Sequence, residues 1–513
     1  MTYPESSVVN WEKSLSGANV KNIKSITGNK IPCEGGYAGD YPCKGVDLYS
    51  FVSPQDMGGL ELNDIWGWTD PQTGKEFALV GLLNGTSFVD VTDPVNPVVL
   101  GLLPTHTVSS IWRDIKVYKN YAYIVSERAG NHGVQIFDLT LLRDVTEFTT
   151  FSETSHYDKV GSAHNIFINE KSGFAYVVGT SSATNPEYVC NGGSHIMDLS
   201  DPINPEFAGC FSHEGTGRSG TGHTHDIQVV IYGGSDSDYV GNEIAFSSNE
   251  TAISIADVTD KSNPIIISKF EVTNPGKQYI HQGWLSKDQK YFFVVDELNE
   301  VNGLDDTQNT LIFDVSDLDN PKLVSMYISS LTTIDHNNYV VDSLLYQSNY
   351  SAGLRILNIR DPLHPGEVAF FDTYPAGNII DFVGSWSNYP FFSSGTIVVS
   401  SIEGGLFVLK INDDVNLATE EDLPLPDQFD LRQNYPNPFN PMTQIQYELP
   451  RAGEIDLTLY NMLGMEVMKL DRGIKPAGIH QILFDGSHLP SGIYFYQLRS
   501  GNFVKTRKMS LLK

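Results

Sequence analysis

The chain of 513 residues carries 62 acidic and 33 basic side chains, which give a net charge of −29. This charge argues against nucleic acid and anionic membrane surfaces as partners, because both are themselves negative. It suits an exposed soluble protein, including one in fluid that contains Ca²⁺. The length suggests two to four domains. No apolar run approaches the length of about 18 residues that spans a bilayer, so no transmembrane segment is expected.

Residues 1–45 are predicted to form an irregular N-terminal segment. The segment begins MTYPESSVVNWEKSLSG, which lacks the basic-then-apolar order of a secretory signal. We therefore expect an export signal to have been removed or to lie upstream.

The four cysteines fall into two close pairs. Cys33 and Cys43 flank the loop EGGYAGDYP. Cys190 precedes one strand and Cys210 ends the strand hairpinned to it, so the turn brings them opposite each other. Two disulfides and an oxidising compartment are the prediction. Four buried free thiols are the alternative.

From residue 46 onward the chain repeats an apolar strand end followed by D-x-x-D-P-x-N-P. The copy SHIMDLSDPINP returns as FVDVTDPVNP, SIADVTDKSNP, LIFDVSDLDNP and RILNIRDPLHP, with a degraded copy QIFDLTLLRDV. A period near fifty residues indicates a repeat array. The six copies are anchored at Asp90, Asp138, Asp198, Asp257, Asp314 and Asn358, which are 48, 60, 59, 57 and 44 residues apart.

Each repeat contains four short β-rich runs. The second repeat has RDIKVY, YAYIVSE, GVQIFDL and EFTTFS, and the fourth has HDIQVVIY, NEIAFSSN, AISIADVT and PIIISKFE. Four strands per unit indicate a propeller blade, so residues 46–411 are predicted to form a β-propeller. Seven blades are expected, or six if the last is misread. They open at Asn63, Arg113, His164, His225, His281, His336 and Ser385.

The seventh predicted blade has only three strands, whereas a surplus strand, VDLYSFVS, precedes the first blade. We expect residues 46–53 to supply the outer strand of the last blade, which closes the ring and removes an open edge.

The D-x-x-D-P-x-N-P segments have a mechanical explanation. The aspartate that ends the third strand can accept N–H bonds within the turn, and proline stops the ladder. A Ca²⁺ loop is the alternative, although the segment lacks the glycine and the closing glutamate of an EF-hand.

Residues 412–432 are predicted to be a polar linker that contains proline. Residues 433–513 contain short runs in which apolar and polar residues alternate, separated by turns with Gly and Pro. These runs are TQIQYEL, IDLTLYN and GIYFYQL. This pattern predicts a small β-sandwich.

Four predicted blades open with a histidine, at intervals of 61, 56 and 55 residues. Opening strands line the channel of a propeller, so these rings are expected at equivalent places on one face. The ends of the second strands return to the same face and carry carboxylates. The histidines are His164, His225, His281 and His336, and the carboxylates are Glu127, Glu250, Asp296, Glu297 and Glu403.

Converging imidazoles could hold Zn²⁺, Cu²⁺ or Fe²⁺, with carboxylates as ligands or as partners of the ligands. An open position on the metal would permit hydrolysis or redox chemistry, with Glu250 or Glu297 as the base. The alternative is structural. Each histidine would then bond to a carboxylate or carbonyl of a neighbouring blade and pin the two blades together.

Trp386 opens the last blade near this face. An aromatic residue at a channel mouth could stack a sugar, although core packing is the commoner role. The predicted ligand-binding residues are Glu127, Asp296, Glu403 and Trp386.

The C-terminal residues, from about 430 to 513, resemble the type A sorting domain of the type IX (Por) secretion system. The matching segments are NYPNPFNP, LTLYNMLGMEV and LPSGIYFYQL, followed by a basic tail. The resemblance implies export across the outer membrane through that machinery, often with removal of this domain and attachment to the cell surface. Its carriers are mainly Bacteroidetes.

Residues from about 30 to 411 resemble the choice-of-anchor B family of LVIVD-repeat propellers. The matching segments include DIWGWTDPQTGKEFALVGLLNGTSFVDVTDP, SSIWRDIKVYKNYAYIVSE and HQGWLSKDQKYFFVVDELNE. The resemblance implies a propeller on the cell surface and supplies no catalytic residues.

The sequence therefore predicts an exported propeller that binds a glycan, a peptide or a protein at the histidine face. A metal-dependent hydrolase or oxidoreductase at that face is the alternative, and a scaffold without a small-molecule site is the third.

Overall fold

Short β-strands make up nearly all of the regular structure. The computed structural model describes residues 23–183, 185–271, 279–304, 307–413, 415, 428–475 and 477–513. The chain divides into two compact units, one holding most residues up to Val415 and one holding the C-terminal strands. Within the described ranges, the helical segments are the 3-10 turns η1 (Leu139–Leu142) and η2 (Pro186–Gly192). A search of these ranges for a long apolar helix that could cross a membrane finds none.

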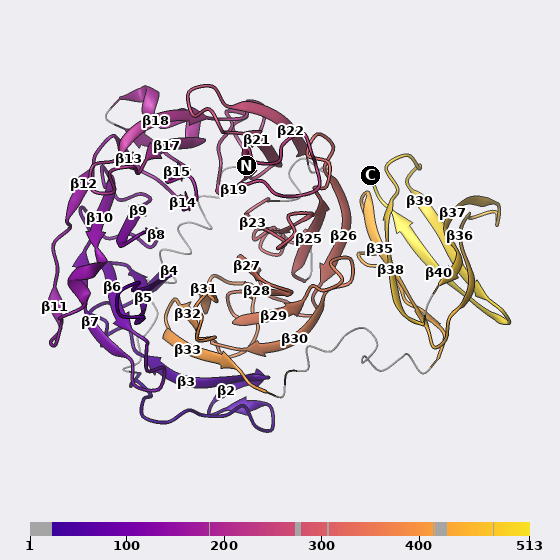
Figure 1. Ribbon diagram of the computed structural model, residues 1–513. Coiled ribbons are helices and arrows are strands. Elements are labelled where there is room, and N and C mark those ends of the chain that lie inside the picture. The colour runs from indigo at the N-terminus through magenta and orange to yellow at the C-terminus, as the bar shows by residue number, and fades with distance from the viewer. Residues whose placement is uncertain are drawn as a thin grey trace. The chain divides into compact units, whose positions relative to one another are not determined.

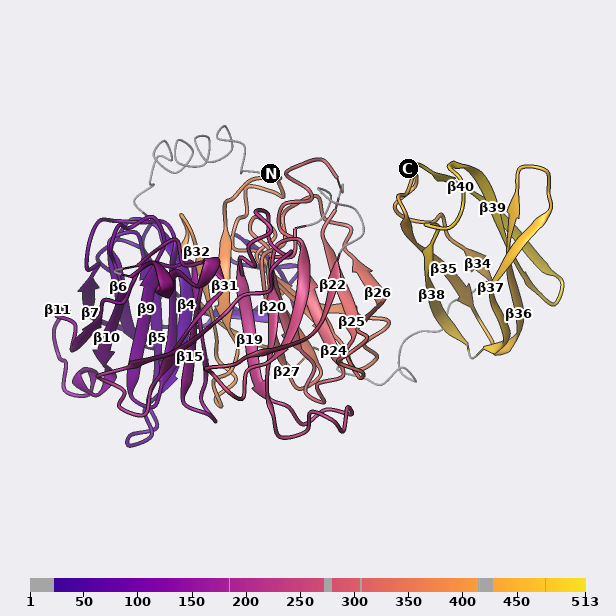
Figure 2. The same cartoon turned by 90° about the horizontal axis from the view of Figure 1, so that it is seen from above.

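In the described part of the first unit, seven sheets of four or more strands stand around a central axis (Figure 1), and Figure 2 shows them in a view turned by 90°. Each sheet is built outward from an innermost strand, so the prediction of a β-propeller is confirmed.

The strands are given from the innermost outward. Sheet 1 has β4 (Leu62–Thr69), β5 (Glu76–Leu82), β6 (Gly85–Asp90) and β7 (Val98–Pro104). Sheet 2 has β8 (Arg113–Tyr118), β9 (Tyr121–Ser126), β10 (Val134–Asp138) and β12 (Ser155–Tyr157). Sheet 3 has β14 (Asn165–Asn169), β15 (Phe174–Val178), β17 (Ser194–Asp198) and β18 (Glu206–Phe211). Sheet 4 has β19 (Asp226–Ile231), β20 (Glu243–Ser248), β21 (Ala252–Asp257) and β22 (Ile265–Glu271).

The remaining sheets follow the same plan. Sheet 5 has β23 (Gln282–Leu285), β24 (Tyr291–Val295), β25 (Asn309–Asp314) and β26 (Lys322–Ile328). Sheet 6 has β27 (Asn337–Val341), β28 (Leu344–Ser348), β29 (Leu354–Asn358) and β30 (Gly366–Phe371). Sheet 7 has β31 (Ser385–Tyr389), β32 (Ile397–Ser401), β33 (Gly405–Ile411) and β3 (Val46–Val52). A separate ribbon pairs β13 (Val160–Ser162) with β16 (Ser182–Ala183).

Burial explains why the inner strands are apolar runs rather than alternating ones. Every residue of β5 and of β20 is buried, because both faces of a propeller sheet are covered by neighbouring sheets. The outer strand β22 is half exposed and carries charged residues.

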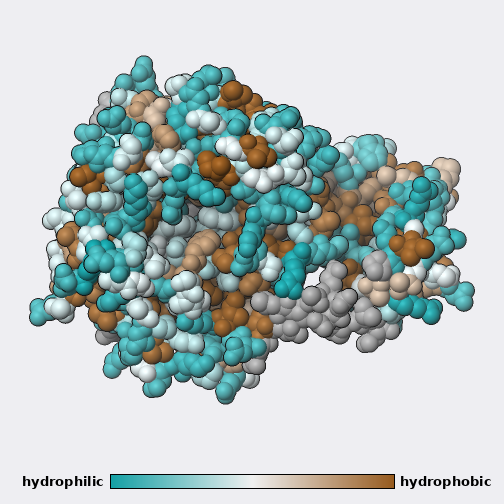
Figure 3. Space-filling model, viewed as in Figure 1, coloured by the Kyte–Doolittle hydropathy of each residue, from teal (hydrophilic) through white to brown (hydrophobic). Residues whose placement is uncertain are grey.

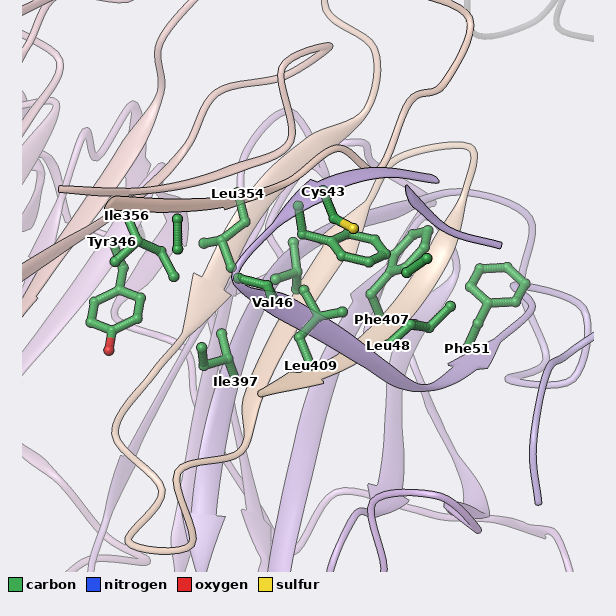
Figure 4. Close-up of a cluster of buried hydrophobic side chains, with 14 of the residues drawn as sticks. Cys43, Val46, Leu48, Phe51, Tyr346, Leu354, Ile356, Ile397, Phe407 and Leu409 are labelled. Carbon is green, nitrogen blue, oxygen red and sulfur yellow. The ribbon is translucent and has the colours of Figure 1, made fainter. Parts of the chain in front are cut away.

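The ring is closed by β3, as the surplus strand predicts. It pairs antiparallel with β33, with Leu48 opposite Leu409 and Phe51 opposite Phe407. Figure 4 shows these side chains in one buried cluster with residues of β28, β29 and β32. Burying a leucine or phenylalanine side chain stabilises the fold by about 1.5–3 kcal/mol, so the cluster holds β3 and β33 together.

The N-terminal segment is less irregular than predicted. Its strands β1 (Tyr37–Ala38) and β2 (Tyr41–Lys44) extend the outer edge of sheet 6, where Cys43 lies opposite Phe371. Strands of two to four residues are too short to show periodicity in a sequence.

Both predicted disulfides are present. Cys33 is joined to Cys43, and Cys190 is joined to Cys210, with Cα atoms 6.0 and 5.3 Å apart. The Cys33 amide also donates to Asp47 Oδ1 at 2.9 Å, which fixes the first loop to β3.

The fourth strand of sheet 2 differs from the prediction. In the run EFTTFS, β11 (Thr149–Thr150) pairs in parallel with β7 of sheet 1, and β12 supplies the fourth strand of sheet 2 instead. Gly101 permits this pairing, since a Cβ atom there would lie 1.9 Å from the Thr149 carbonyl oxygen. The chain from β11 to β12 therefore crosses from one sheet edge to the next.

The turn aspartates cap their own turns. Asp198 Oδ1 accepts from the Ser200 amide at 2.7 Å, and Asp201 accepts from the Ile203 amide at 3.2 Å and from Asn204 Nδ2 at 3.0 Å. The same bonds recur at the turns after β6, β21 and β25. These bonds favour the structural interpretation of the repeat over a Ca²⁺ loop.

The C-terminal unit consists of two sheets over one core. The core contains Ile445, Tyr447, Leu457, Leu459 and Tyr496 among others. One sheet has β34 (Asp430–Leu431), β35 (Met442–Leu449) and β38 (Gly478–Asp485), and the other has β37 (Glu466–Lys475), β36 (Gly453–Asn461), β39 (Gly492–Ser500) and β40 (Phe503–Leu511). This is the strand-rich region expected from 433–513. Most of the predicted linker 412–432 lies outside the described residues.

The surface is mixed in character. The face seen in Figure 3 intersperses hydrophilic and hydrophobic residues, and the large exposed apolar side chains come from many separate elements. Scattered exposed apolar residues of this kind are ordinary for a soluble surface.

Candidate metal centre on the propeller axis

Side chains of the innermost strands form layers along the propeller axis. Because side chains alternate along a strand, the repeat places equivalent residues of successive sheets at one level. One level is aromatic, with the ring centroid of Tyr339 5.0 Å from that of Trp284 and 6.0 Å from that of Trp66. Another level is formed by the histidines that precede the innermost strands.

A polar layer contains three carboxylates and one lysine. Lys116 Nζ lies 2.5 Å from Asp114 Oδ1 and 3.5 Å from Asp64 Oδ2. Asp226 Oδ2 accepts a hydrogen bond from Asn165 Nδ2 at 3.1 Å. Burial raises the pKa of Asp64 well above its usual range and that of Asp226 to about 7.

These polar side chains line a cavity together with His281 and His336. The space in it that the centre of a water-sized molecule can occupy is about 20 Å³. A cavity of this size holds a water molecule or an ion.

The four predicted histidines form a continuous row of rings. Ring centroids are 4.2 Å apart for His164 and His225, 4.3 Å for His225 and His281, and 4.4 Å for His281 and His336. Neighbouring planes are tilted by 41–54°. His225, His281 and His336 are buried, and His164 is half-buried.

Three of these rings are oriented by carbonyl groups of the next sheet. Nδ1 of His225 lies 3.0 Å from the carbonyl oxygen of His281, and Nδ1 of His281 lies 3.2 Å from that of His336. Nδ1 of His336 lies 2.6 Å from the carbonyl oxygen of Trp386. A carbonyl oxygen only accepts, so Nδ1 carries the proton and Nε2 presents a lone pair. These bonds also connect blade to blade, as the structural interpretation expects.

Glu297 faces this row from the end of β24. It is 5% exposed, and its Oε1 accepts from the Tyr350 hydroxyl at 2.8 Å. Its Oε2 has no hydrogen-bond partner among the described residues and lies 3.5 Å from Nε2 of His281. Nε2 of His336 lies 3.7 Å from Oε1. Burial raises the pKa of Glu297 to about 7.

The backbone of Glu297 is also unusual. Its φ is 36°, in the left-handed region that non-glycine residues seldom adopt. Such a conformation costs energy and is kept only where the surroundings enforce it.

These residues form a donor set that suits a metal. One ligand atom each from His225, His281 and Glu297 lies within 4.8 Å of the other two. Two imidazoles and one carboxylate are a typical three-residue set for catalytic zinc, with further positions open. A ring N–H on a carbonyl oxygen commonly orients histidines that bind a metal through the other nitrogen.

His164 differs from the other three predicted ligands. Its Nδ1 lies 2.7 Å from Glu127 Oε2, a carboxylate rather than a carbonyl. Although burial opposes it, this pairing raises the pKa of His164 and lowers that of Glu127. Both side chains are partly exposed, so the pair lies at the accessible end of the row.

Glu250 is bound to Arg218. Its Oε1 lies 2.6 and 2.8 Å from two guanidinium nitrogens, and Oε2 accepts from the Arg218 amide at 2.9 Å. His223 Nε2 is 3.7 Å from the same carboxylate. Both carboxylate oxygens of Glu250 are therefore engaged, whereas Glu297 keeps one oxygen without a hydrogen-bond partner among the described residues.

The other predicted ligand-binding residues are not members of the three-residue donor set. Asp296 is buried in a separate acidic group with Glu300 and Asp335. Glu403 Oε2 accepts from the Gly384 amide at 3.1 Å. Trp386 is 7% exposed and packs against His336, with ring centroids 5.1 Å apart, so its ring has little surface on which to stack a sugar.

Sequence reasoning missed Tyr350 and Arg218. Tyr350 is a buried tyrosine whose hydroxyl reaches Glu297 across 53 positions of sequence, and nothing local marks it. Arg218 lies in GTGRSGTGHTH, where the glycines predict only a flexible loop. The only available signal was a single basic residue within a glycine-rich segment beside two histidines.

Comparisons with known proteins identify the C-terminal part. Residues 433–511 match the family described as the secretion system C-terminal sorting domain. The protein is therefore exported to the cell surface or the extracellular space, and this domain engages the type IX secretion machinery. No curated protein matches the chain.

Several solved structures are similar to this chain at 10–11% sequence identity. A protein from Lactobacillus plantarum has 11% identity and a TM-score of 0.43, covering 83% of this chain and 100% of its own. The periplasmic gluconolactonase of Pseudomonas aeruginosa has 10% identity and a TM-score of 0.43, covering 82% and 99%. A chain of the COPII outer coat vertex has 11% identity and a TM-score of 0.45, covering 81% and 98%. At these scores, the similarities carry no functional argument.

Proposed function

We propose that this exported propeller binds a divalent transition metal on its axis through His225, His281 and Glu297, with His336 beside them. The observation that carries the proposal is the shared orientation of the rings. Each Nδ1–H is bound to a carbonyl of the next sheet, so each Nε2 lone pair is fixed and left for another partner.

The second argument is an electrostatic one. Nε2 of His281 and the unpartnered oxygen of Glu297 are both acceptors, and they face each other at 3.5 Å in a buried site. Burial lowers the pKa of His281 well below its usual range, so protonation of the ring is disfavoured. A cation between the acceptors satisfies all of them at once, whereas a single proton satisfies one pair.

The donor types select the class of metal. Imidazole nitrogen with one carboxylate suits Zn²⁺, Cu²⁺ or Fe²⁺, whereas Ca²⁺ prefers six to eight oxygen ligands. The planes of His225 and His281 are tilted by 48°, so their in-plane lone pairs are not parallel as those of stacked rings are.

Metal analysis of the full chain tests this proposal. The purified protein is stripped with a chelator, dialysed against Zn²⁺ and assayed for bound zinc, alongside His225→Ala and His281→Ala. We expect both variants to lose one zinc per chain relative to the wild type, and the surface variant His364→Ala to lose none. Equal zinc in the wild type and both variants would refute the site.

A ligand-binding role is proposed for the rim of the same face. The partly exposed side chains there are Glu127, His164, Arg218 and His223, which offer both charges and hydrogen-bond donors. They suit a glycan, peptide or protein that remains outside the buried centre. A glycan array with the metal-loaded protein and an Arg218→Ala variant tests this role, and equal binding by the two proteins would argue against it.

Metal-dependent catalysis, hydrolytic or redox, is the second candidate. Its support is the polar cavity beside His281 and His336, which has room for a water molecule that a bound metal could activate. Turnover of chromogenic esters or phenols by the zinc- or copper-loaded wild type, absent in His281→Ala, is the expected result. Equal rates would exclude it.

We also propose that residues from about 30 to 411 belong to the choice-of-anchor B family of LVIVD-repeat propellers. The proposal is supported by the repeated segments of the sequence and by the sorting domain at residues 433–511.

A further inference from the structure

A second group of histidines lies far from the axis, at the outer edges of sheets 1 and 2. His106 follows β7, the fourth strand of sheet 1, and His156 belongs to β12, the outer strand of sheet 2. Glu153 lies between them on the segment that crosses from β11 to β12. One ligand atom of each residue lies within 4.8 Å of the others.

We propose that His106, Glu153 and His156 form a second site for a divalent transition metal, which ties sheet 1 to sheet 2. Two imidazoles and one carboxylate are borderline donors that favour Zn²⁺ or Cu²⁺ over Ca²⁺ or Mg²⁺. This proposal is independent of the axial centre, with which it shares no residue.

Distances around Glu153 support the assignment. Its Oε1 lies 3.0 Å from Nδ1 of His106 and 3.5 Å from Nδ1 of His156. Its Oε2 accepts from Gln135 Nε2 at 3.0 Å. Gln135 Nε2 also donates to the carbonyl oxygen of Pro104 at 3.1 Å, so it holds the carboxylate against sheet 1. A bond of this kind orients a carboxylate ligand.

A second observation is the state of His156. Its Nδ1 is buried and has no hydrogen-bond partner among the described residues. A buried nitrogen without a partner in a polar group requires an explanation, and a bound ion supplies one.

The rings must turn to bind the metal. They are stacked with centroids 3.8 Å apart and planes 17° from parallel, so their in-plane lone pairs do not yet converge. Rotation about the Cβ–Cγ bond is soft for histidine. The side chain of His106 is 35% exposed, so part of it faces solvent.

His132 is near but is not a ligand. Its ring centroid is 6.3 Å from that of His106. Its two nitrogens are engaged, one 3.3 Å from Arg113 and the other 3.0 Å from the carbonyl oxygen of Gly133. The site therefore has three protein ligands, with the remaining position open to water.

The test uses the full chain with the axial centre disabled by His281→Ala. The stripped protein is dialysed against Zn²⁺ alone, and bound metal is measured with Co²⁺ absorption as a second readout. We expect about one zinc per chain, lost when His106→Ala is added and weakened at least tenfold when Glu153→Gln is added. If His281→Ala does not fold, Glu297→Gln serves as the background, since it keeps every ring in place.

The outcomes separate the two sites. A wild type that binds two zinc ions supports both. If it binds one ion that His281→Ala removes and His106→Ala does not, the outer site is overturned and the axial site stands. If it binds one ion that only His106→Ala removes, the outer site stands alone. No zinc in the disabled background overturns the outer site.

Discussion

The axial row and the outer cluster, His106, Glu153 and His156, use the same side chains but hold them in opposite ways. On the axis, main-chain carbonyls fix three rings, the planes are tilted, and burial is nearly complete. At the outer edge, side chains hold the group, the rings are stacked, and the site is partly exposed. A centre built on backbone is preorganised, whereas one built on side chains must rearrange to bind.

The largest expected effect is at the centre of the axial row. His281→Ala removes a ligand and leaves the carbonyl of His336 without its donor, and it also opens a cavity. We expect loss of the axial zinc and a decrease of about 3 kcal/mol in the free energy of unfolding. Urea denaturation and zinc analysis measure both. A matched outer variant, His106→Ala, should cost less than about 1 kcal/mol, and equal losses would remove the distinction between the two sites.

A fall in pH should lower the free energy of unfolding of the metal-free protein, because the buried rings of the axial row resist protonation. Burial lowers the pKa of His336 to about 3, below the usual value near 6.5, so only the unfolded chain gains this proton as pH falls below 6.5. The stability that His336 contributes is present above pH 6.5 and is lost as pH falls toward 3. Between pH 7 and 5 the loss is about 2 kcal/mol.

The variant His336→Asn isolates this effect. It keeps an N–H donor but has no titrating group, so its stability should fall less between pH 7 and 5 than that of the wild type. Glu297 and Asp226, whose raised pKa values act in the opposite direction, are present in both proteins. Parallel pH profiles in urea would contradict the assignment of a buried neutral ring.

At the outer cluster, the support of Glu153 can be removed without touching a ligand. Gln135→Leu should weaken zinc binding there about tenfold, or about 1.4 kcal/mol, because the carboxylate loses its anchor. Calorimetric titration with zinc in the His281→Ala background measures the affinity of the outer cluster. The axial affinity should not change in an otherwise wild-type chain, and a parallel loss at both sites would indicate a general loss of structure.

The smallest effect is expected at the accessible end of the row. Glu127→Gln removes the carboxylate that raises the pKa of His164, so this pKa should fall. Nuclear magnetic resonance titration of the ring measures the change. Axial zinc should be retained, because His164 is outside the three-residue donor set. Loss of zinc in this variant would show that His164 is a ligand.

The repeated segments of the sequence and their spacing determined the propeller, its closing strand and the row of histidines. The spacing of His164, His225, His281 and His336 matches the repeat, so equivalent places on successive innermost strands had to bring them together. The two cysteine pairs and the sorting domain were also readable, because each depends on short local segments.

Tertiary structure alone decided which nitrogen each ring presents and which carboxylate faces it. Glu250 and Glu297 occupy similar places in the repeat, yet Arg218 binds the first and Tyr350 binds the second. The outer cluster also depends on the crossing from β11 to β12, which no local pattern marks. Periodicity in a sequence fixes only the level along the propeller axis at which a residue lies. Its hydrogen-bond partners on other sheets depend on how side chains pack at the scale of an ångström.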